Sequence, residues 1–269
     1  MTGVRLLRAA QAVALPLALL VLWEAAGRAG LLPEGILPMP STIAHTWKIW
    51  AFGQGGAAAS FGLNPYSGTW GWTVLYSARR VAEGFAVAVL VAVPLGILIG
   101  WSAGVARTFD PLIQGLRPIP ITAWLPFSIA LFGIRDMGAV FLIALGAFYP
   151  IVVNTTHGAR DVGRNLIRAA SMMGARQTDL LLRVVFPNAL PAIFTGMRIG
   201  LGIAWTAVIV AEIVAVKSGL GYVLWDAYYV GRMDVVLADM VSIGLAGFLT
   251  DRLMVFLAAR TLHWQALSR

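Results

Sequence analysis

The segment RAASMMGARQTDLLLRVVFP, residues 168–187, is charged and interrupted by glycine, and it lies between two long apolar runs. Leu166, Ala170 and Met173 recur at helical spacing on one face, and Gly174 breaks that pattern. The helical pattern then resumes and continues to the next apolar run. We therefore expect two short helices that meet at a glycine, in an element that cannot cross a membrane.

The second short helix is predicted to begin at Thr178, whose hydroxyl would cap it, and to end where Pro187 starts the next span. The first short helix would present small and apolar side chains to the aqueous phase, and such a patch usually marks a protein partner. The same pattern also fits a helix on the lipid headgroups, with its arginines on anionic phosphates. The residues alone favour neither interpretation.

Composition places the rest of the chain in a membrane. Of 269 residues, 59% are hydrophobic and 12% are charged, and the mean hydropathy is +0.81, unlike a soluble domain. The net charge of +8 would suggest nucleic acid in a polar chain, but here the arginines lie between apolar runs and indicate topology instead. The chain has no cysteine, which excludes disulfides, thiolate metal sites and a cysteine nucleophile.

The apolar runs predict an all-α, polytopic membrane protein with about six transmembrane helices. The predicted spans are 9–23, 81–101, 118–134, 137–156, 187–211 and 236–257. The first run resembles a signal peptide, but the spans that follow favour an uncleaved anchor. We expect an anchor helix and periplasmic loop over 1–80, a transmembrane domain over 81–260 that contains the loop 160–187, and a tail over 261–269. Glycines in two of the spans would let helices approach closely; they are Gly96, Gly100, Gly196, Gly200 and Gly202.

The positive residues of the loops predict the orientation. One side receives Arg5, Arg8, Arg107, Arg160, Arg164, Arg168, Arg176, Arg183, Arg260 and Arg269, and the other receives Arg28, Lys48, Arg79, Arg80, Arg135, Lys217 and Arg232. The margin of ten to seven favours an orientation with both termini and the loop 160–187 in the cytoplasm.

The segment 168–187 resembles the EAA loop of ATP-binding-cassette importer permeases, whose pattern is EAAxxxG, nine residues, then IxLP. Here RAASMMG is followed by the nine residues ARQTDLLLR and then by VVFP. Other stretches resemble the nitrate/sulfonate/taurine/bicarbonate branch, among them LPMPSTI, DPLIQGLRPIPITAWLPFSIALFGI and FPNALPAIFTGMRIGLGIAWTAVIVAEI. The resemblance covers roughly residues 37–226 and implies the type I importer permease fold with a cytoplasmic coupling-helix loop.

In this family the loop docks in a groove on the nucleotide-binding subunit, which implies partner contacts in this chain. The residues concerned are Arg168, Ala169, Ala170, Met173, Gly174, Ala175 and Asp179. The first motif position is typically Glu in the family but is Arg168 here. Either the partner carries a compensating acidic residue or the position is tolerant in this branch. The small Ala169, Ala170 and Gly174, which would allow close approach, are retained.

The resemblance also implies a mechanism and a set of partners. The sequence has no GxxxxGK[ST] phosphate loop, so we expect ATP and Mg²⁺ in separate ATPase subunits, and neither enzymatic activity nor a cofactor or metal in this chain. Nucleotide-driven closure of the ATPases would rock the spans between inward-open and outward-open arrangements. A periplasmic solute-binding protein would deliver the substrate, and a second permease copy would complete a homodimer in the bilayer.

Charges inside the spans are the candidates for the translocation path, because a charge there costs about 2.5–3.5 kcal/mol on insertion scales. Arg198 follows Pro191 and would lie roughly 10 Å into the bilayer; with Arg117 it would offset the charge of a sulfonate, nitrate or bicarbonate. The alternative for Arg198 is structural, as a snorkelling side chain that caps carbonyls or pairs with a carboxylate. Trp205 and Glu212 are further pathway candidates, with packing and a gate or interface as their alternatives.

The predicted function is therefore the permease subunit of a binding-protein-dependent importer for a small anion. One alternative is a permease for a heterocyclic or vitamin-precursor cargo. Another is an ATP-independent secondary transporter, which should show inverted repeats, although the two halves of the sequence show no such likeness. A membrane-embedded enzyme would need clustered acid, base or metal residues, and the intramembrane charges do not cluster.

Overall fold

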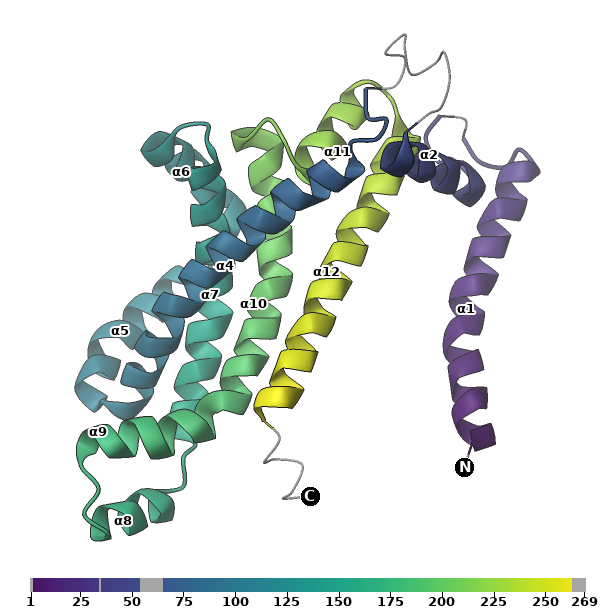
Figure 1. The fold of residues 1–269 in the computed structure, drawn as a ribbon. Coiled ribbons are helices and arrows are strands. Elements are labelled where there is room, and N and C mark those ends of the chain that lie inside the picture. The colour runs from purple at the N-terminus through teal and green to yellow at the C-terminus, as the bar shows by residue number, and fades with distance from the viewer. Residues whose placement is uncertain (1, 34, 54–64, 263–269) are drawn as a thin grey trace. The chain divides into compact units, whose positions relative to one another are not determined.

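The computed structural model describes residues 2–33, 35–53 and 65–262, with side chains from residue 14 onward. The structure is 84% helical, and the described residues include no strand. The elements are α1 (Thr2–Arg28), α2 (Pro40–Phe52), α4 (Trp70–Trp101), α5 (Ala103–Leu116), the 3₁₀ turn η1 (Ile121–Trp124), α6 (Leu125–Phe132), α7 (Asp136–Arg160), α8 (Arg164–Met172), α9 (Gln177–Asp179), the π-helical turn η2 (Leu180–Val185), α10 (Phe186–Ala215), α11 (Leu220–Tyr229) and α12 (Met233–Thr261) (Figure 1).

Long apolar helices confirm the prediction of an all-α, multi-pass membrane protein. Among the described residues, four helical segments are long and apolar enough to cross a membrane: α4, α7, α9 through α10, and α12. The pair α5 and η1–α6 is a fifth candidate, bent by 95°. Helix α1, of 27 residues, covers the first predicted span, and the side chains of its first turns lie outside the described part.

Two of the predicted spans differ from the helices that form. Helix α4 begins at Trp70 rather than at residue 81. The polar residues of its first turns, which contact other helices, lower the local hydropathy, and the predicted apolar span therefore starts too late. The predicted third span is not one helix. The chain breaks after α5 at a linker that contains Pro118 and Pro120, since proline restricts the residue before it and removes a helical donor.

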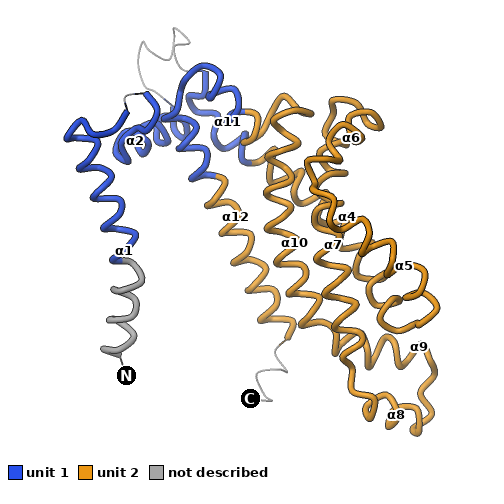
Figure 2. The backbone as a smooth tube through the Cα atoms, turned by 180° about the vertical axis from the view of Figure 1, so that it is seen from behind, with its two compact units in different colours: residues 1–74, 223–242 blue, residues 75–222, 243–269 orange. Residues whose placement is uncertain are grey.

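The chain forms two compact units, Met1–Val74 with Val223–Ser242, and Leu75–Tyr222 with Ile243–Arg269 (Figure 2). The first unit, which includes α1 and α2, is held by polar contacts of its aromatic residues. The indole N–H groups of Trp47 and Trp70 both donate to Ser242 Oγ, at 3.0 and 2.9 Å. The hydroxyl of Tyr66 donates to Asp226 at 2.6 Å. The tryptophan-rich segment is therefore a packed part of this unit, and the predicted division at residues 80 and 260 stays a prediction.

The second unit is a bundle in which α7 packs against both α4 and α10 through glycine. A Cβ at Gly96 of α4 would lie 2.7 Å from Thr155 Cβ, and one at Gly196 of α10 would lie 2.8 Å from Asn154 Cβ. Both distances are shorter than the contacts that real Cβ atoms make. Only glycine therefore allows the backbones of α4 and α10 to approach α7 this closely. The predicted close approach is thus confirmed there, whereas a Cβ at Gly202 would meet no atom within 4 Å and the prediction is wrong for that residue.

Candidate functional site

A loop of two helical arms joins α7 to α10, as the sequence predicts (Figure 1). Helix α8 forms the first arm, and the arms meet at Gly174, whose φ of +86° favours glycine. The predicted cap at Thr178 is wrong: α9 begins at Gln177 without a side-chain cap. The second arm also continues through η2 into α10, because Pro187 lies in the first turn of α10, where a missing N–H costs nothing.

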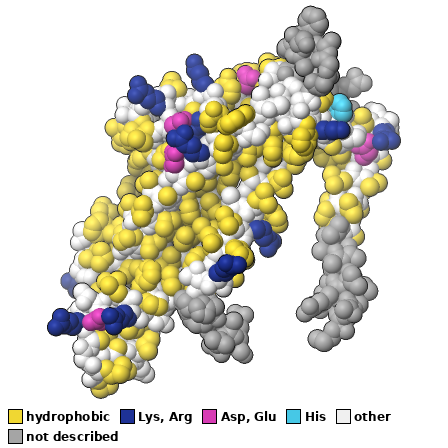
Figure 3. Space-filling model, in the orientation of Figure 1, with side chains coloured by type: hydrophobic (Ala, Val, Ile, Leu, Met, Phe, Trp, Pro, Cys, Tyr) yellow, Lys and Arg dark blue, Asp and Glu magenta, His cyan; other side chains and the backbone are white. Residues whose placement is uncertain are grey.

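The end of the first arm is an exposed apolar surface, which we call the methionine tip and define as Ala169, Met172, Met173 and Gly174. The two methionines are 84% and 83% exposed, and Ala169 and Gly174 are exposed as well. Figure 3 shows apolar side chains at the surface of the α8 region. A contiguous apolar surface that faces water is typical of a protein interface.

The remaining predicted partner residues divide between the surface and the interior. Arg168 is exposed, whereas Ala170 is buried and Ala175 is half-buried, so the methyl group of Ala170 packs inside the loop rather than at its surface. Asp179 forms an ion pair of 3.5 Å with the exposed Arg183, one turn along the second arm.

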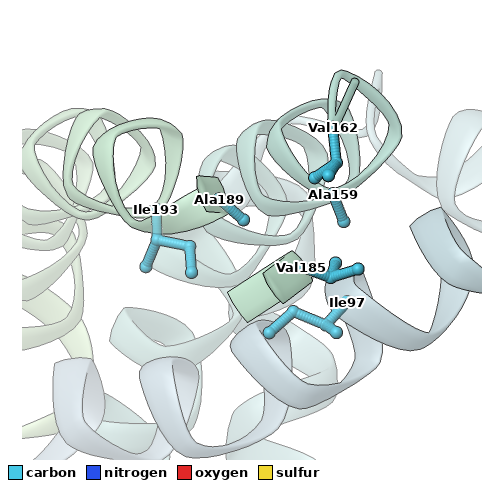
Figure 4. Packing of buried hydrophobic residues seen from close by; sticks show 6 residues of the cluster. All are labelled: Ile97, Ala159, Val162, Val185, Ala189 and Ile193. Atoms are coloured by element: carbon cyan, nitrogen blue, oxygen red, sulfur yellow. The ribbon is translucent and has the colours of Figure 1, made fainter. Parts of the chain in front are cut away.

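The loop rests on a buried apolar cluster that joins three long helices. Ile167 of α8 and Leu181 of η2 pack against the cluster from the two arms. The cluster itself consists of Ile97 from α4, Ala159 from the end of α7, Val162 from the segment between α7 and α8, Val185 from η2, and Ala189 and Ile193 from α10 (Figure 4). The cluster therefore connects both arms of the loop to α4, α7 and α10 by close packing.

Arg198, a predicted pathway residue, forms a bidentate ion pair with Asp251 of α12. Its Nε lies 2.9 Å from Asp251 Oδ1, and its Nη2 lies 3.1 Å from Oδ2. The pair lines a hollow of about 290 Å³ with Thr195 and Ile199. The arrangement matches the structural alternative for Arg198, since its charge is already met by a carboxylate.

Glu212, a second pathway candidate, is fully buried and surrounded by donors from the protein. The guanidinium of Arg80 lies 2.7 Å from its carboxylate, Ser77 Oγ donates to it at 2.8 Å, and the N–H of Gly221 donates at 2.9 Å. Arg80 also pairs with Asp136 at 2.8 Å. The carboxylate thereby ties α4 to α10 and to the start of α11.

The role of Arg80 is not predicted from the sequence, because the count of positive residues places it among the loop charges. The residue is 3% exposed and lies inside α4, so it is part of the fold and reports nothing about topology. The spacing of Ser77 and Arg80, three residues apart, puts both on one helix face and was the available signal.

Trp205, the third pathway candidate, is also a packing residue in this structure. It is 5% exposed, and its indole N–H donates to Thr250 Oγ1 of α12 at 2.9 Å. A buried indole with its donor satisfied stabilises the contact between α10 and α12.

Arg117, the fourth candidate, lines a cavity of about 410 Å³ at the break between α5 and η1. Trp124, Tyr149 and Asn154 lie in the same wall, together with apolar residues of α7 and α10. None of the residues that line this cavity is Asp or Glu. The cavity is therefore a mostly apolar chamber with one cationic side chain.

Long apolar helices, a bent candidate span beside a cavity and a two-armed loop are the features expected of a membrane permease. Residues 92–263 match the family of binding-protein-dependent transport system inner membrane components, and this chain belongs to that family. It is therefore a multi-pass inner-membrane protein and a permease component of ABC importers.

Several relatives are similar over most of this chain. A putative ABC transporter permease protein of Methanocaldococcus jannaschii is 42% identical over 213 residues, covering 77% of this chain and 80% of the relative. The nitrate import permease protein NrtB of Synechocystis sp. is 33% identical over 94% of this chain and 88% of its own length. The bicarbonate transport system permease protein CmpB of Synechococcus elongatus is 36% identical over 69% of this chain and 67% of its own length.

The fold is similar to that of a solved importer. The MetNI methionine ABC transporter, in an inward-facing conformation, has a chain that matches with a TM-score of 0.57 and 22% sequence identity, over 68% of this chain and 93% of that chain. This similarity establishes the type I importer permease fold for this chain.

Proposed function

We propose that this chain forms the translocation path for a small anion and moves it by alternating access that a separate ATPase subunit drives. The observation that carries the coupling half of this proposal is the methionine tip. The tip is exposed, although a soluble loop gains nothing from two exposed methionines. The two arms that carry it pack through Ile167 and Leu181 against the cluster that joins α4, α7 and α10. An apolar groove on the ATPase would bury it.

Nucleotide binding in the ATPases would displace the docked tip, and the cluster would pass this displacement to the three helices. The break at Gly174 and the π-helical turn η2 are the two irregular points of the loop. Irregular turns of this kind often mark functional sites in helices. ATP and Mg²⁺ belong to the partner subunits in this scheme, and a periplasmic binding protein and a second permease copy complete the transporter.

The cargo we propose is a small oxyanion. Two relatives are named as nitrate and bicarbonate permeases, and sulfonates such as taurine present the same singly charged group of oxygens. The cavity beside Arg117, with a single cation and no carboxylate in its wall, agrees with an anion better than with a neutral heterocycle. Transport assays with each of these cargo classes would distinguish the two possibilities.

The substitution Met173→Glu tests the coupling proposal. In proteoliposomes with the ATPase and the binding protein, we expect cargo uptake and the stimulation of ATP hydrolysis to fall by about tenfold or more, because a charge in an apolar groove is costly to desolvate. The matched control is Met137→Glu, the same change at an exposed methionine at the other end of α7, and it should retain activity. Normal coupling in Met173→Glu would contradict the proposal.

The charge at Arg168 needs its own experiment. The side chain is exposed beside the methionine tip, and we propose that it meets an acidic residue of the ATPase. Arg168→Glu should then abolish the stimulation of ATP hydrolysis, whereas Arg168→Gln should weaken it by severalfold, as expected for one charged hydrogen bond. An unchanged rate in both variants would show that the position is tolerant.

A further inference from the structure

We infer that the cavity at the break between α5 and η1 binds a small monovalent oxyanion within a single copy of this chain, with Arg117 as the charged contact. The inference rests on the proposed function, because it identifies a binding site for the transported anion in the membrane domain. The site is built from the linker 117–120, from η1, and from the facing walls of α7 and α10.

The first argument is the backbone at the break. Helix α5 and the η1–α6 segment are together long and apolar enough to form one membrane span, but their axes are bent by 95°. Pro118 and Pro120 lie in the linker between them. In a bilayer, non-helical backbone is tolerated where it is buried in protein or lines a water-filled cavity. The linker lines this cavity with Arg117, Pro118 and Pro120, so the broken span and the cavity form one feature.

The second argument is the charge of Arg117. Its side chain is exposed, no residue of the cavity wall is acidic, and among the described side chains no carboxylate lies within 4 Å of it. Two other arginines of the same unit differ, because Arg80 pairs with Glu212 and Arg198 pairs with Asp251. An anion that enters the cavity gains a free guanidinium at Arg117, whereas at Arg198 it must displace a bidentate carboxylate.

The third argument is the size and chemistry of the wall. A volume of about 410 Å³ lies at the lower end of the usual range for small-molecule sites. Tyr149 adds a hydroxyl donor and Asn154 an amide, whose Nδ2 also donates to Pro150 O at 2.8 Å. The indole N–H of Trp124, another wall residue, is buried and has no hydrogen-bond partner in the structure. These donors, together with the guanidinium of Arg117 and no carboxylate in the wall, favour an anion over a cation.

The experiment uses the absence of cysteine from this chain. Val153→Cys places one thiol in the cavity wall of the transporter assembled with its partner subunits in nanodiscs. The rate at which the uncharged reagent methyl methanethiosulfonate labels this thiol is followed by intact mass, at constant ionic strength, with sodium nitrate, sodium bicarbonate or sodium methanesulfonate. We expect at least one anion to slow the labelling, and the order of the three identifies the preferred oxyanion.

Arg117 is tested with the same reporter. Arg117→Gln should raise the anion concentration needed for protection by about tenfold, and Arg117→Lys should retain most of the protection. Arg107→Gln, at an exposed arginine within α5 that does not line the cavity, is the matched control, and a thiol at Ala103→Cys should not be protected at all. If Arg117→Gln does not assemble, Tyr149→Phe takes its place and should weaken protection by severalfold.

Two results would overturn the inference: no protection by any of the three anions, or equal protection in Arg117→Gln and the parent. Neither result bears on the methionine tip, because labelling is measured without ATP hydrolysis. Conversely, normal coupling in Met173→Glu would overturn the coupling half of the proposed function and leave the anion site standing.

Discussion

At the scale of single residues, the Arg80–Glu212 pair illustrates how a membrane bundle retains buried charge. The side chains are 4% and 0% exposed and lie 2.7 Å apart, and Ser77, Asp136 and Ser218 satisfy further donors and acceptors. Such a pair is weak support for stability by itself, since desolvation offsets its attraction, but removing one partner leaves a buried charge without compensation.

We therefore expect Arg80→Gln to lower the free energy of unfolding by about 3–5 kcal/mol. The neighbouring Arg79→Gln is the control, because Arg79 is 64% exposed and pairs with Glu83, one turn away, and such pairs contribute about 0.3–0.5 kcal/mol. Thermal unfolding in detergent, monitored by circular dichroism, compares the two variants. Equal stability losses would show that the buried network has no special role.

At the scale of elements, the two-armed loop depends on the backbone of one residue. Gly174 has a φ of +86°, and a Cβ there would meet no atom within 4 Å, so the reason for glycine is conformation and not space. A residue with a side chain pays about 1–2 kcal/mol in this left-handed region.

Gly174→Ala should consequently loosen the joint between the arms and reduce the stimulation of ATP hydrolysis. Gly163→Ala is the matched control: Gly163, the residue before α8, has a φ of −55° and equally open surroundings, so alanine should be neutral or slightly stabilising. Amide hydrogen exchange over residues 164–176 reports the loosening directly. Unchanged protection in Gly174→Ala would remove the joint from the coupling scheme.

At the scale of the whole membrane bundle, the short distance between the backbones of α10 and α7 limits which side chains can be accommodated. A Cβ at Gly196 would clash with Asn154 Cβ at 2.8 Å and with the carbonyl oxygen of Pro150 at 2.9 Å. The backbone oxygen has no alternative rotamer, so the helices must move apart, and overpacking of this kind typically costs about 1–3 kcal/mol.

Gly196→Ala is thus expected to destabilise the assembled permease, whereas Gly202→Ala in the same helix, where a Cβ has open space, should be neutral or stabilise by about 0.5–1 kcal/mol through helix propensity. The yield of monodisperse protein after heating, measured by size-exclusion chromatography, distinguishes the variants. Similar yields for both would indicate that α7 and α10 can separate without cost.

The sequence by itself determined the all-helical membrane class, most of the spans and the two-armed loop, because hydropathy, helical spacing and glycine act locally along the chain. It also indicated the family through the spacing of the EAA-like motif. Only the tertiary structure decided that Arg198 is paired, that Glu212 and Trp205 are buried, and that Arg117 lines a cavity without acidic residues. Pairing and burial depend on residues such as Asp251 and Arg80 that lie far away in the sequence, and no local pattern records which of them meet.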